Sequence, residues 1–389
     1  MELLKQALWT LVLLVLSVEA YAVDVTTITP TGIDESTKTL QFTQDGNALG
    51  TLTGSYTISS NGSSDGKVGT YAIIEYSYDK WMVGRSGSSS GAFSGTYTIT
   101  FEEETYVYGV EMDVSTHNYS GISINDFNGY ANRYSGTICC TPKNSGIKRS
   151  SITVSLSGAN TGGDNKIGVG TIKIYTGDKS MVNTTITPTA VNGTSLSFDT
   201  DDTYLGNFSA SYTIENTSGT TGTLSFTYNE GWRAQSESET TVTGSFSSTV
   251  TISFDEEVYI GGIAIENSGS SSGDTTLSIE DFNNVYNRSG GLGGTYGFVP
   301  VDPTVKRKSF TIKTGAGGYG TSMYTTIKKI IIEASKLVPD VTAHIDGWTY
   351  GTTASSPTAE GNPEGNTVEQ AVWYSSGSDE PLASAPVTA

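Results

Sequence analysis

A set of aspartate, asparagine and arginine residues occurs twice in this 389-residue chain, with the same spacing between its members each time. Each occurrence has Asp-Phe-Asn, followed a few residues later by Asn-Arg. Carboxylate and amide oxygens can ligate Ca²⁺ or accept hydrogen bonds from sugar hydroxyls, and an arginine fork adds donors. The candidate binding residues are Asp126, Asn128, Asn132 and Arg133 in the first occurrence, and Asp281, Asn283, Asn287 and Arg288 in the second.

A structural role competes with ligand binding at these positions. Aspartate and asparagine often fix turns through side-chain hydrogen bonds to the backbone, and arginine often pairs with aspartate. In a strand, alternation puts Phe127 and Phe282 on the opposite face from their polar neighbours, which leaves the polar set on a loop-rich rim. Both interpretations stay open, and turn fixing is the commoner one. The candidate Ca²⁺ ligands are Asp126, Asn128, Asp281 and Asn283.

Two tryptophans, Trp81 and Trp232, occupy similar places in the two halves, each after a tyrosine-rich segment. An exposed indole can stack on a sugar ring, whereas a single tryptophan in a β-sandwich more often fills the core. Gly231 directly precedes Trp232, and glycine is typical of a loop. The sequence therefore leaves two roles for each tryptophan, a sugar platform or a core residue.

Two acidic runs, at 102–104 and 255–257, also recur. Clustered carboxylates can bind Ca²⁺, but the ion takes 6–8 oxygen ligands and one run supplies too few. We therefore favour a solvated hairpin turn, where charge also opposes edge-to-edge aggregation.

Catalysis finds little support in the sequence. The only histidines, His117 and His344, do not recur at matching places, and no nucleophile elbow, metalloprotease motif or phosphate loop occurs. A pair of carboxylates for glycoside hydrolysis remains the open alternative. We expect a protein that is not an enzyme and has no cofactor other than a candidate Ca²⁺ ion.

The chain contains two copies of one long unit. Thr-Thr-Ile-Thr-Pro at 26–30 recurs at 184–188, and Ile99-Thr-Phe-Glu-Glu-Glu recurs as Ile252-Ser-Phe-Asp-Glu-Glu. Ile172 and Ile174 match Ile330 and Ile332 near the ends of the copies. Preserved order with small length differences indicates duplication of a whole domain, with insertions in surface loops. We place the copies at 24–178 and 182–338, joined by a short link that predicts a semi-rigid rod.

Apolar side chains alternate with polar ones throughout each copy. Tyr97, Ile99 and Phe101 precede the acidic run, and a second alternating stretch over 106–114 follows it. Two such runs separated by a turn predict an antiparallel hairpin. Further strands are expected at 54–58, 71–78, 122–127, 151–156 and 170–175. The fold class is therefore all-β, with two tandem β-sandwich domains that resemble jelly rolls; an immunoglobulin-like sandwich is the alternative.

The N-terminus and the composition indicate the compartment. Residues 1–22 are typical of a secretory signal peptide, with Lys5, a short apolar run and Ala20-Tyr21-Ala22 as a cleavage site. The run is too short to span a bilayer, so no membrane insertion is expected after its removal. A net charge of −19 repels phosphate and excludes nucleic acid as a partner. The two cysteines, Cys139 and Cys140, are adjacent, which leaves a strained vicinal disulfide or two free thiols.

The composition changes after residue 339. The segment Gly347-Trp-Thr-Tyr-Gly351, followed by Gly361-Asn-Pro and Val372-Trp-Tyr-Ser, resembles the opening of small immunoglobulin-like β modules of the MBG/YDG type. This resemblance covers 340–389 and implies a bacterial surface protein. Thr352 departs from the acidic residue usual in that family, and the closing strands of the module are missing. We therefore expect a partial module and a longer parent chain.

Two functions compete from the sequence alone. The first is a secreted, cell-surface adhesin whose repeats are lectin-like modules that bind glycans or other surface components of host or bacterium. Linked copies suit weak glycan binding, because the second site acts at a raised effective concentration. The second is a structural stalk or spacer with no ligand of its own, and a polysaccharide-degrading enzyme is a third, less favoured interpretation.

Overall fold

The computed structural model describes residues 23–61, 63–64, 67–68, 72–85, 91–116, 120–132, 136–160, 166–178, 180–336, 342–344 and 358–360. The expected signal peptide and Arg133 lie outside these residues. Of the expected C-terminal module only two short strands are described, β25 (Thr342–His344) and β26 (Thr358–Glu360), which pair antiparallel.

All regular elements in the described part of the chain are strands, which confirms the all-β fold class. The described residues contain no helix that is long and apolar enough to cross a membrane. The first copy contains β1 (Val23–Asp34), β2 (Thr39–Asp45), β3 (Thr53–Asn61), β4 (Ser63–Ser64), β5 (Lys67–Val68), β6 (Ala72–Ser77), β7 (Lys80–Arg85), β8 (Gly91–Ser115), β9 (Ser120–Ile124), β10 (Phe127–Asn128), β11 (Tyr130–Asn132), β12 (Gly136–Pro142), β13 (Lys148–Asn160) and β14 (Lys166–Gly177). The second contains β15 (Val182–Asn192), β16 (Ser195–Thr200), β17 (Phe208–Asn216), β18 (Thr223–Tyr228), β19 (Trp232–Ser270), β20 (Asp274–Ile279), β21 (Phe282–Asn283), β22 (Val285–Ser289), β23 (Gly294–Pro300) and β24 (Lys306–Ser335).

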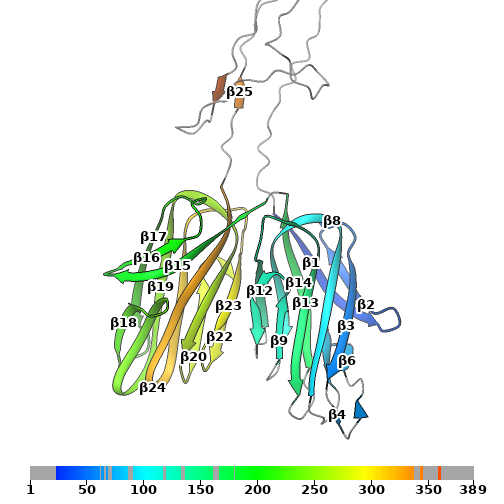
Figure 1. The fold of residues 1–389 in the computed structure, drawn as a ribbon, viewed down its shortest axis with the longest axis horizontal. Coiled ribbons are helices and arrows are strands. Elements are labelled where there is room, and N and C mark those ends of the chain that lie inside the picture. The colour runs from blue at the N-terminus through cyan, green and yellow to red at the C-terminus, as the bar shows by residue number, and fades with distance from the viewer. Residues whose placement is uncertain are drawn as a thin grey trace, which may run out of the picture. The chain divides into compact units, whose positions relative to one another are not determined.

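The first copy is a sandwich of two antiparallel sheets (Figure 1). One sheet runs β3, the first half of β8, β13, β9 and β11. The other runs β12, the second half of β8, β14, β1 and β2, and β7 with β6 joins it at the first residues of β14. Strand β8 therefore belongs to both sheets.

The second copy repeats this pairing order. Residues 242–253 of β19 pair with β17 on one side and with β24 on the other. In the same sheet β24 pairs with β20, and β20 pairs with β22. Residues 258–270 of β19 pair with β23 and the last part of β24, which also pairs with β15. Ile28 faces Ile172 in the first copy, and their counterparts Ile186 and Ile330 face each other in the second. The duplicated sequence thus forms the same register twice.

The hairpin expected around each acidic run is wrong. Strand β8 continues through 102–104 without a turn, and its two halves pair with different sheets instead of with each other. The pairing register of β8 shifts at this point, between Arg149 and Ser151 of β13. Apolar and polar residues alternate on both sides of the acidic run. A hairpin and a single strand that passes from one sheet to the other therefore have the same sequence pattern.

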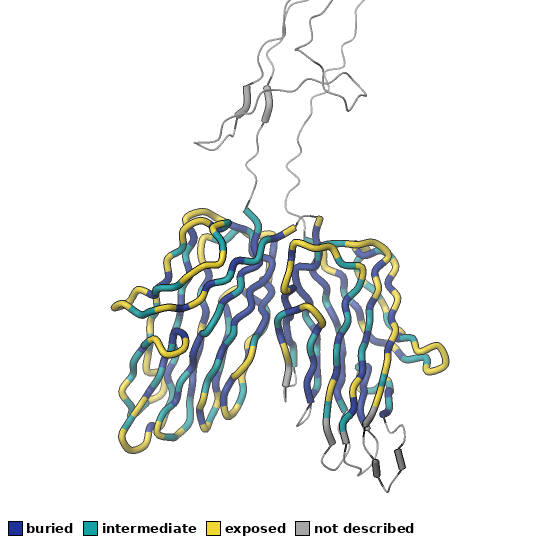
Figure 2. Tube along the Cα trace, viewed as in Figure 1, coloured by how far each residue is buried: buried dark blue, intermediate teal, exposed yellow. Residues whose placement is uncertain are grey.

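Buried residues alternate with more exposed ones along the strands of each copy (Figure 2), and most of the buried apolar residues of both copies form one continuous cluster. Tyr97, Ile99 and Phe101 from one sheet are buried, as are Val110 and Met112 from the other. The acids of both runs are exposed where the strands pass from sheet to sheet. Burial at every second position is what a sandwich with one wet face per sheet requires.

The two copies also contact each other directly, within one compact unit that spans Tyr21–Lys336. Strands β12 and β23 pair antiparallel at Cys139 and Gly297, which are separated by the same offset as Ile172 and Ile330 and are therefore equivalent positions. A Cβ added at Gly109 would lie 2.6 Å from Val299 Cγ2 of the second copy. A Cβ added at the equivalent Gly262 would lie 2.5 Å from Thr141 Cγ2 of the first copy. Reciprocal contacts of this kind define a self-complementary interface around a local two-fold axis.

The two-fold relation does not hold for every polar contact between the copies, and the contact of Asn283 is one exception. Asn283 donates through Nδ2 to the Tyr175 hydroxyl of the first copy, over 3.1 Å. The positions related to these two by the repeat hold Asn128 and Glu333. The amide nitrogen of Asn128 and both carboxylate oxygens of Glu333 are buried and have no hydrogen-bond partner among the described residues. A buried carboxyl group thus stands where the first copy has a hydrogen-bonded phenol.

Cys139 and Cys140 are both free thiols and are both fully buried. Burial raises the pKa of Cys140 to about 12 and raises that of Cys139 well above its usual value, with Glu111 adding to the shift at Cys139. The reactive species is the thiolate. We therefore expect a soluble thiol reagent to modify both cysteines about a thousandfold more slowly in the native protein than in denaturant. Equal rates in the two states, or a count of no thiols in denaturant, would contradict this arrangement.

Candidate functional site

The repeated Asp-Phe-Asn element forms a turn in each copy. Asp126 and Asp281 both have a φ of 61°, which ends the preceding strand, so the single strand expected over 122–127 is interrupted. Aspartate tolerates this left-handed conformation better than most residues. The aspartates are exposed, whereas Phe127 and Phe282 are only 5% and 7% exposed. The opposite placement of phenylalanine and aspartate is the one that alternation predicts.

An arginine from the start of β24 packs against the second of these turns. The guanidinium of Arg307 lies 5.2 Å from the centroid of the Phe282 ring. It donates to the carbonyl oxygens of Val305, over 2.9 Å, and Asp302, over 3.0 Å. Partial burial lowers the pKa of Arg307, and the carboxylates of Asp281 and Asp302 oppose that shift. An arginine remains charged under such conditions, so the turn carries a fixed cation among carboxylates.

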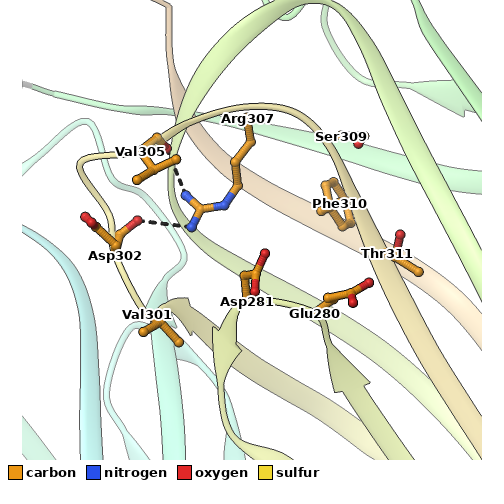
Figure 3. A pocket seen from close by; sticks show the side chains of 9 residues that line it. All are labelled: Glu280, Asp281, Val301, Asp302, Val305, Arg307, Ser309, Phe310 and Thr311. Atoms are coloured by element: carbon orange, nitrogen blue, oxygen red, sulfur yellow. Dashed lines mark hydrogen bonds between the residues drawn. The ribbon is translucent and has the colours of Figure 1, made fainter.

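These side chains line an open pocket of about 390 Å³ in the second copy. Figure 3 shows Arg307 between Asp281 and the loop that carries Asp302, with Val301 and Val305 beside it. The complete lining is Glu280, Asp281, Val301, Asp302, Val305, Arg307, Ser309, Phe310 and Thr311. The pocket therefore offers acceptors, donors and small apolar surfaces together.

The asparagines of the motif do not join this pocket. Asn283 reaches across to Tyr175 of the first copy, and the amide nitrogen of Asn128 is buried. Asp281 and Asn283 are therefore used in different places, one in the pocket and one between the copies. Within the described residues, no group of three or more His, Cys, Asp or Glu side chains could hold a metal ion.

The Asn-Arg pair of the motif also lies elsewhere. Asn287 and Arg288 are on β22, which pairs with β20 in the outer part of its sheet, and the Arg288 side chain lies beside Tyr296. Asn132 is on the corresponding strand β11, where it pairs with Gly121. In the second copy the polar set does not gather on one rim, since Asp281 lines the pocket and Asn283, Asn287 and Arg288 do not. For the first copy the expectation stays a prediction, because Arg133 lies outside the described residues.

The arginine that the pocket does use left a signal in the sequence. Arg149 and Arg307 each follow a lysine, and the two Lys-Arg pairs are separated by the same offset as Ile172 and Ile330. Comparison of the copies through the segment after β12 would have found them. The Asn-Arg pair lies closer to the Asp-Phe-Asn motif along the chain than the Lys-Arg pair does, so the sequence alone favours the wrong arginine.

The sugar-stacking role of the two tryptophans is wrong. Trp81 and Trp232 are 0% and 1% exposed. Trp81 Nε1 donates to the carbonyl of Gly32 over 3.0 Å, and Trp232 Nε1 donates to that of Ser197 over 3.2 Å. Each indole also makes an edge-to-face contact with a phenylalanine of the second strand of its copy. Both rings are core residues, the other role that the sequence allowed.

In the first acidic run, Glu102 lines an open pocket of about 440 Å³ together with Gln44, Asn47, Gly50 and Thr51. Glu102 accepts a hydrogen bond from the Thr51 backbone over 2.7 Å, and Glu256 lies 3.3 Å from Lys336 Nζ. The backbone contact holds the pKa of Glu102 below its ordinary value. These carboxylates therefore brace neighbouring segments at the sheet crossing.

No protein-family model matches this chain, and no curated protein matches it. Among solved structures, a fucolectin from striped bass (Morone saxatilis) serum matches at 12% identity, covers 66% of this chain and 86% of its own, and has a TM-score of 0.21. The CBM32-1 and CBM32-2 domains of Clostridium perfringens ZmpB match at 8% identity, with coverage of 71% and 92% and a TM-score of 0.18. Similarity at these TM-scores carries no argument about the present chain, and its fold rests on its own strand pairings.

Proposed function

We propose that this protein binds carbohydrate, without cleaving it, at the pocket that Asp281 and Arg307 form in the second copy. The supporting observation is the pocket itself, where an exposed carboxylate and a fixed guanidinium converge beside apolar side chains. Its volume of about 390 Å³ lies within the ordinary range for small-ligand sites.

The lining suits a sugar chemically. Hydroxyl groups donate to the carboxylates of Asp281 and Asp302 and accept from the free N–H groups of Arg307. Val301 and Val305 are 64% and 47% exposed and offer small surfaces to the C–H face of a ring. Hydrogen bonds to charged groups are the stronger kind, which favours recognition of polar ligands in an otherwise open site.

We further propose that the protein acts outside the cell as a surface adhesin. The signal-like N-terminus, the acidic composition and the C-terminal resemblance to bacterial surface modules support this setting.

Three carboxylates line the pocket, so the binding assay must also look for cleavage of the polysaccharide.

The test is a glycan array with the full chain, followed by calorimetry on any sugar that binds. Asp281→Asn keeps the shape and the left-handed backbone while it removes the charge, and we expect affinity to fall about tenfold or more. Glu257→Gln removes an exposed charge outside the pocket and should leave binding unchanged. A blank array with and without Ca²⁺ would overturn the proposal, and release of reducing ends would turn it toward an enzyme.

A spacer is the second candidate function. The direct contact between the copies favours it, since β12–β23 pairing and the Tyr175–Asn283 hydrogen bond restrict their relative motion. In that case the glycan array would be blank with and without Ca²⁺.

A further inference from the structure

The pocket residues of the second copy have counterparts held by the same contacts in the first. Arg149 lies 5.0 Å from the centroid of the Phe127 ring and donates to the carbonyls of Ile147 and Asn144, over 3.2 and 2.8 Å. These contacts match those of Arg307 one by one.

The backbone of the two turns also agrees. Lys143 N donates to the Asp126 carbonyl over 2.9 Å, and Val301 N donates to that of Asp281 over 3.0 Å. At the base of the turn, the backbone N–H of Asn125 donates to the carbonyl of Thr153 in β13, over 2.9 Å. In the same way the backbone N–H of Glu280 donates to the carbonyl of Thr311 in β24, over 3.0 Å. The first copy therefore presents the same scaffold with different side chains.

The differences at three positions all change the charge in one direction. Glu280, Val301 and Asp302 of the second copy correspond to Asn125, Lys143 and Asn144 of the first. With the shared Asp-Arg pair included, the second site has three acids and one arginine, whereas the first has one acid, one lysine and one arginine.

Neighbouring groups do not cancel this contrast. Lys313 lies 3.4 Å from Glu280, but both side chains are at least half exposed, so this pair offsets only part of the negative charge. Thr304 donates to Asp302 from its hydroxyl and its backbone, which keeps the pKa of that carboxyl below its ordinary value and the group ionised. Glu333 faces Arg149 from the second copy, but its burial raises its pKa and favours the neutral acid.

We infer that the two copies bind sugars of opposite charge: the site with Lys143 and Arg149 takes acidic sugars that carry a carboxylate, and the site with Asp281 and Asp302 takes amino sugars that carry an ammonium group. This inference rests on the proposed carbohydrate function. The duplicated scaffold supplies position, and the exchanged side chains supply selectivity, because a mismatched charge is repelled and a matched one attracted.

The experiment measures binding of two probes to the full chain by calorimetry. The probes are an oligogalacturonate and a glucosamine oligomer, at a mildly acidic pH where the amine is protonated and the carboxylates stay ionised. We expect one equivalent of each probe per chain, and weaker binding of both as salt is raised.

Exchange of the charge-bearing residues provides the decisive variants. Val301→Lys with Asp302→Asn should weaken the amino-sugar probe at least tenfold and raise the uronate stoichiometry to two. Lys143→Val with Asn144→Asp should weaken binding of the uronate probe at least tenfold and raise the stoichiometry of the amino-sugar probe to two. Asp255→Asn with Glu257→Gln shifts the net charge as much as the first variant does, but outside the pocket, and should change neither stoichiometry.

The outcomes separate the inference from the function on which it rests. If neither these probes nor neutral oligosaccharides bind, the carbohydrate function fails. If sugars bind and the exchanges leave both affinities and stoichiometries unchanged, the charge assignment is wrong while carbohydrate binding stands. Circular dichroism of each variant shows whether a lost signal reflects lost fold.

Discussion

Replacing Trp81 with alanine is expected to lower the free energy of unfolding by about 3–5 kcal/mol, the usual cost of deleting a large buried aromatic side chain. The ring is fully buried, contacts Tyr97 and Phe42 edge to face, and donates to the carbonyls of Gly32 and Gln41. Its loss removes apolar contacts and leaves two strand carbonyls without that partner. Urea unfolding followed by circular dichroism measures the change.

Two comparisons make this result specific. Trp81→Phe keeps much of the apolar volume but loses the indole N–H, so a smaller loss is expected than for alanine. Tyr78→Ala removes an aromatic ring that is 89% exposed in the adjoining hairpin, and should change stability by about 0.5 kcal/mol or less. An alanine variant at Trp81 as stable as the Tyr78 variant would contradict the core assignment. Trp232→Ala tests the second copy in the same way.

Replacing Glu333 with glutamine is expected to stabilise the protein at neutral pH, by on the order of 1 kcal/mol, because an amide cannot ionise and folding then no longer has to keep a buried carboxyl group neutral. Glu333 is 1% exposed and has no hydrogen-bond partner among the described residues. Ser145 lies near, but its hydroxyl already contacts Asn183 and Met181, and Arg149 donates to two backbone carbonyls. The carboxyl group is therefore poorly compensated when it ionises.

The pH dependence gives the sign of this effect. Burial raises the pKa of Glu333 well above 4.5, and Arg149 only partly opposes the shift. As pH rises from about that value, the unfolded chain loses this proton before the folded chain does, so the stability of the native state falls. Glu333→Gln removes this contribution, and its advantage over the unchanged protein should grow from mildly acidic to neutral pH. Thermal unfolding at a series of pH values follows the difference.

Glu333→Tyr supplies the matched variant. It places at this position the residue that its counterpart Tyr175 already provides, and we expect the new hydroxyl to accept from Asn128 as Tyr175 accepts from Asn283. Tyr175→Phe should cost about 1 kcal/mol by breaking the existing pair. A Glu333→Gln variant that is less stable at neutral pH would mean that the carboxylate is ionised and paired with Arg149 instead.

Periodicity and duplication were sufficient to predict most of the fold. Alternation at Tyr97, Ile99 and Phe101 predicted the buried face of a strand. The matched isoleucines indicated a duplicated domain, and the two copies indeed have the same strand register at these residues. The same alternation could not distinguish a hairpin from a strand that changes sheets. That choice depends on which distant strands compete for the backbone hydrogen bonds of β8, and a local pattern contains no such information.

The candidate site was only partly accessible to sequence reasoning. The Asp-Phe-Asn turn was found because it recurs, but the partner that completes it, Arg307, comes from a segment beyond another strand. The role of Asn283 depends on Tyr175 of the other copy, a contact that exists only once the copies are packed. For Trp81, residue type alone fits a core or a sugar platform equally well, and only the position of the neighbouring strands decides.

The way the chain enters and leaves each copy determines how it responds to tension. Val23 at the start of β1 pairs with Gly177 at the end of β14, and Val182 pairs with Ala334 in the same manner. Force applied along the polypeptide would therefore peel two neighbouring strands apart from their common end, so that their hydrogen bonds break one after another instead of together. Such a unit extends under a small pull, and in a tether it would act as a yielding link that lengthens before its attachment fails.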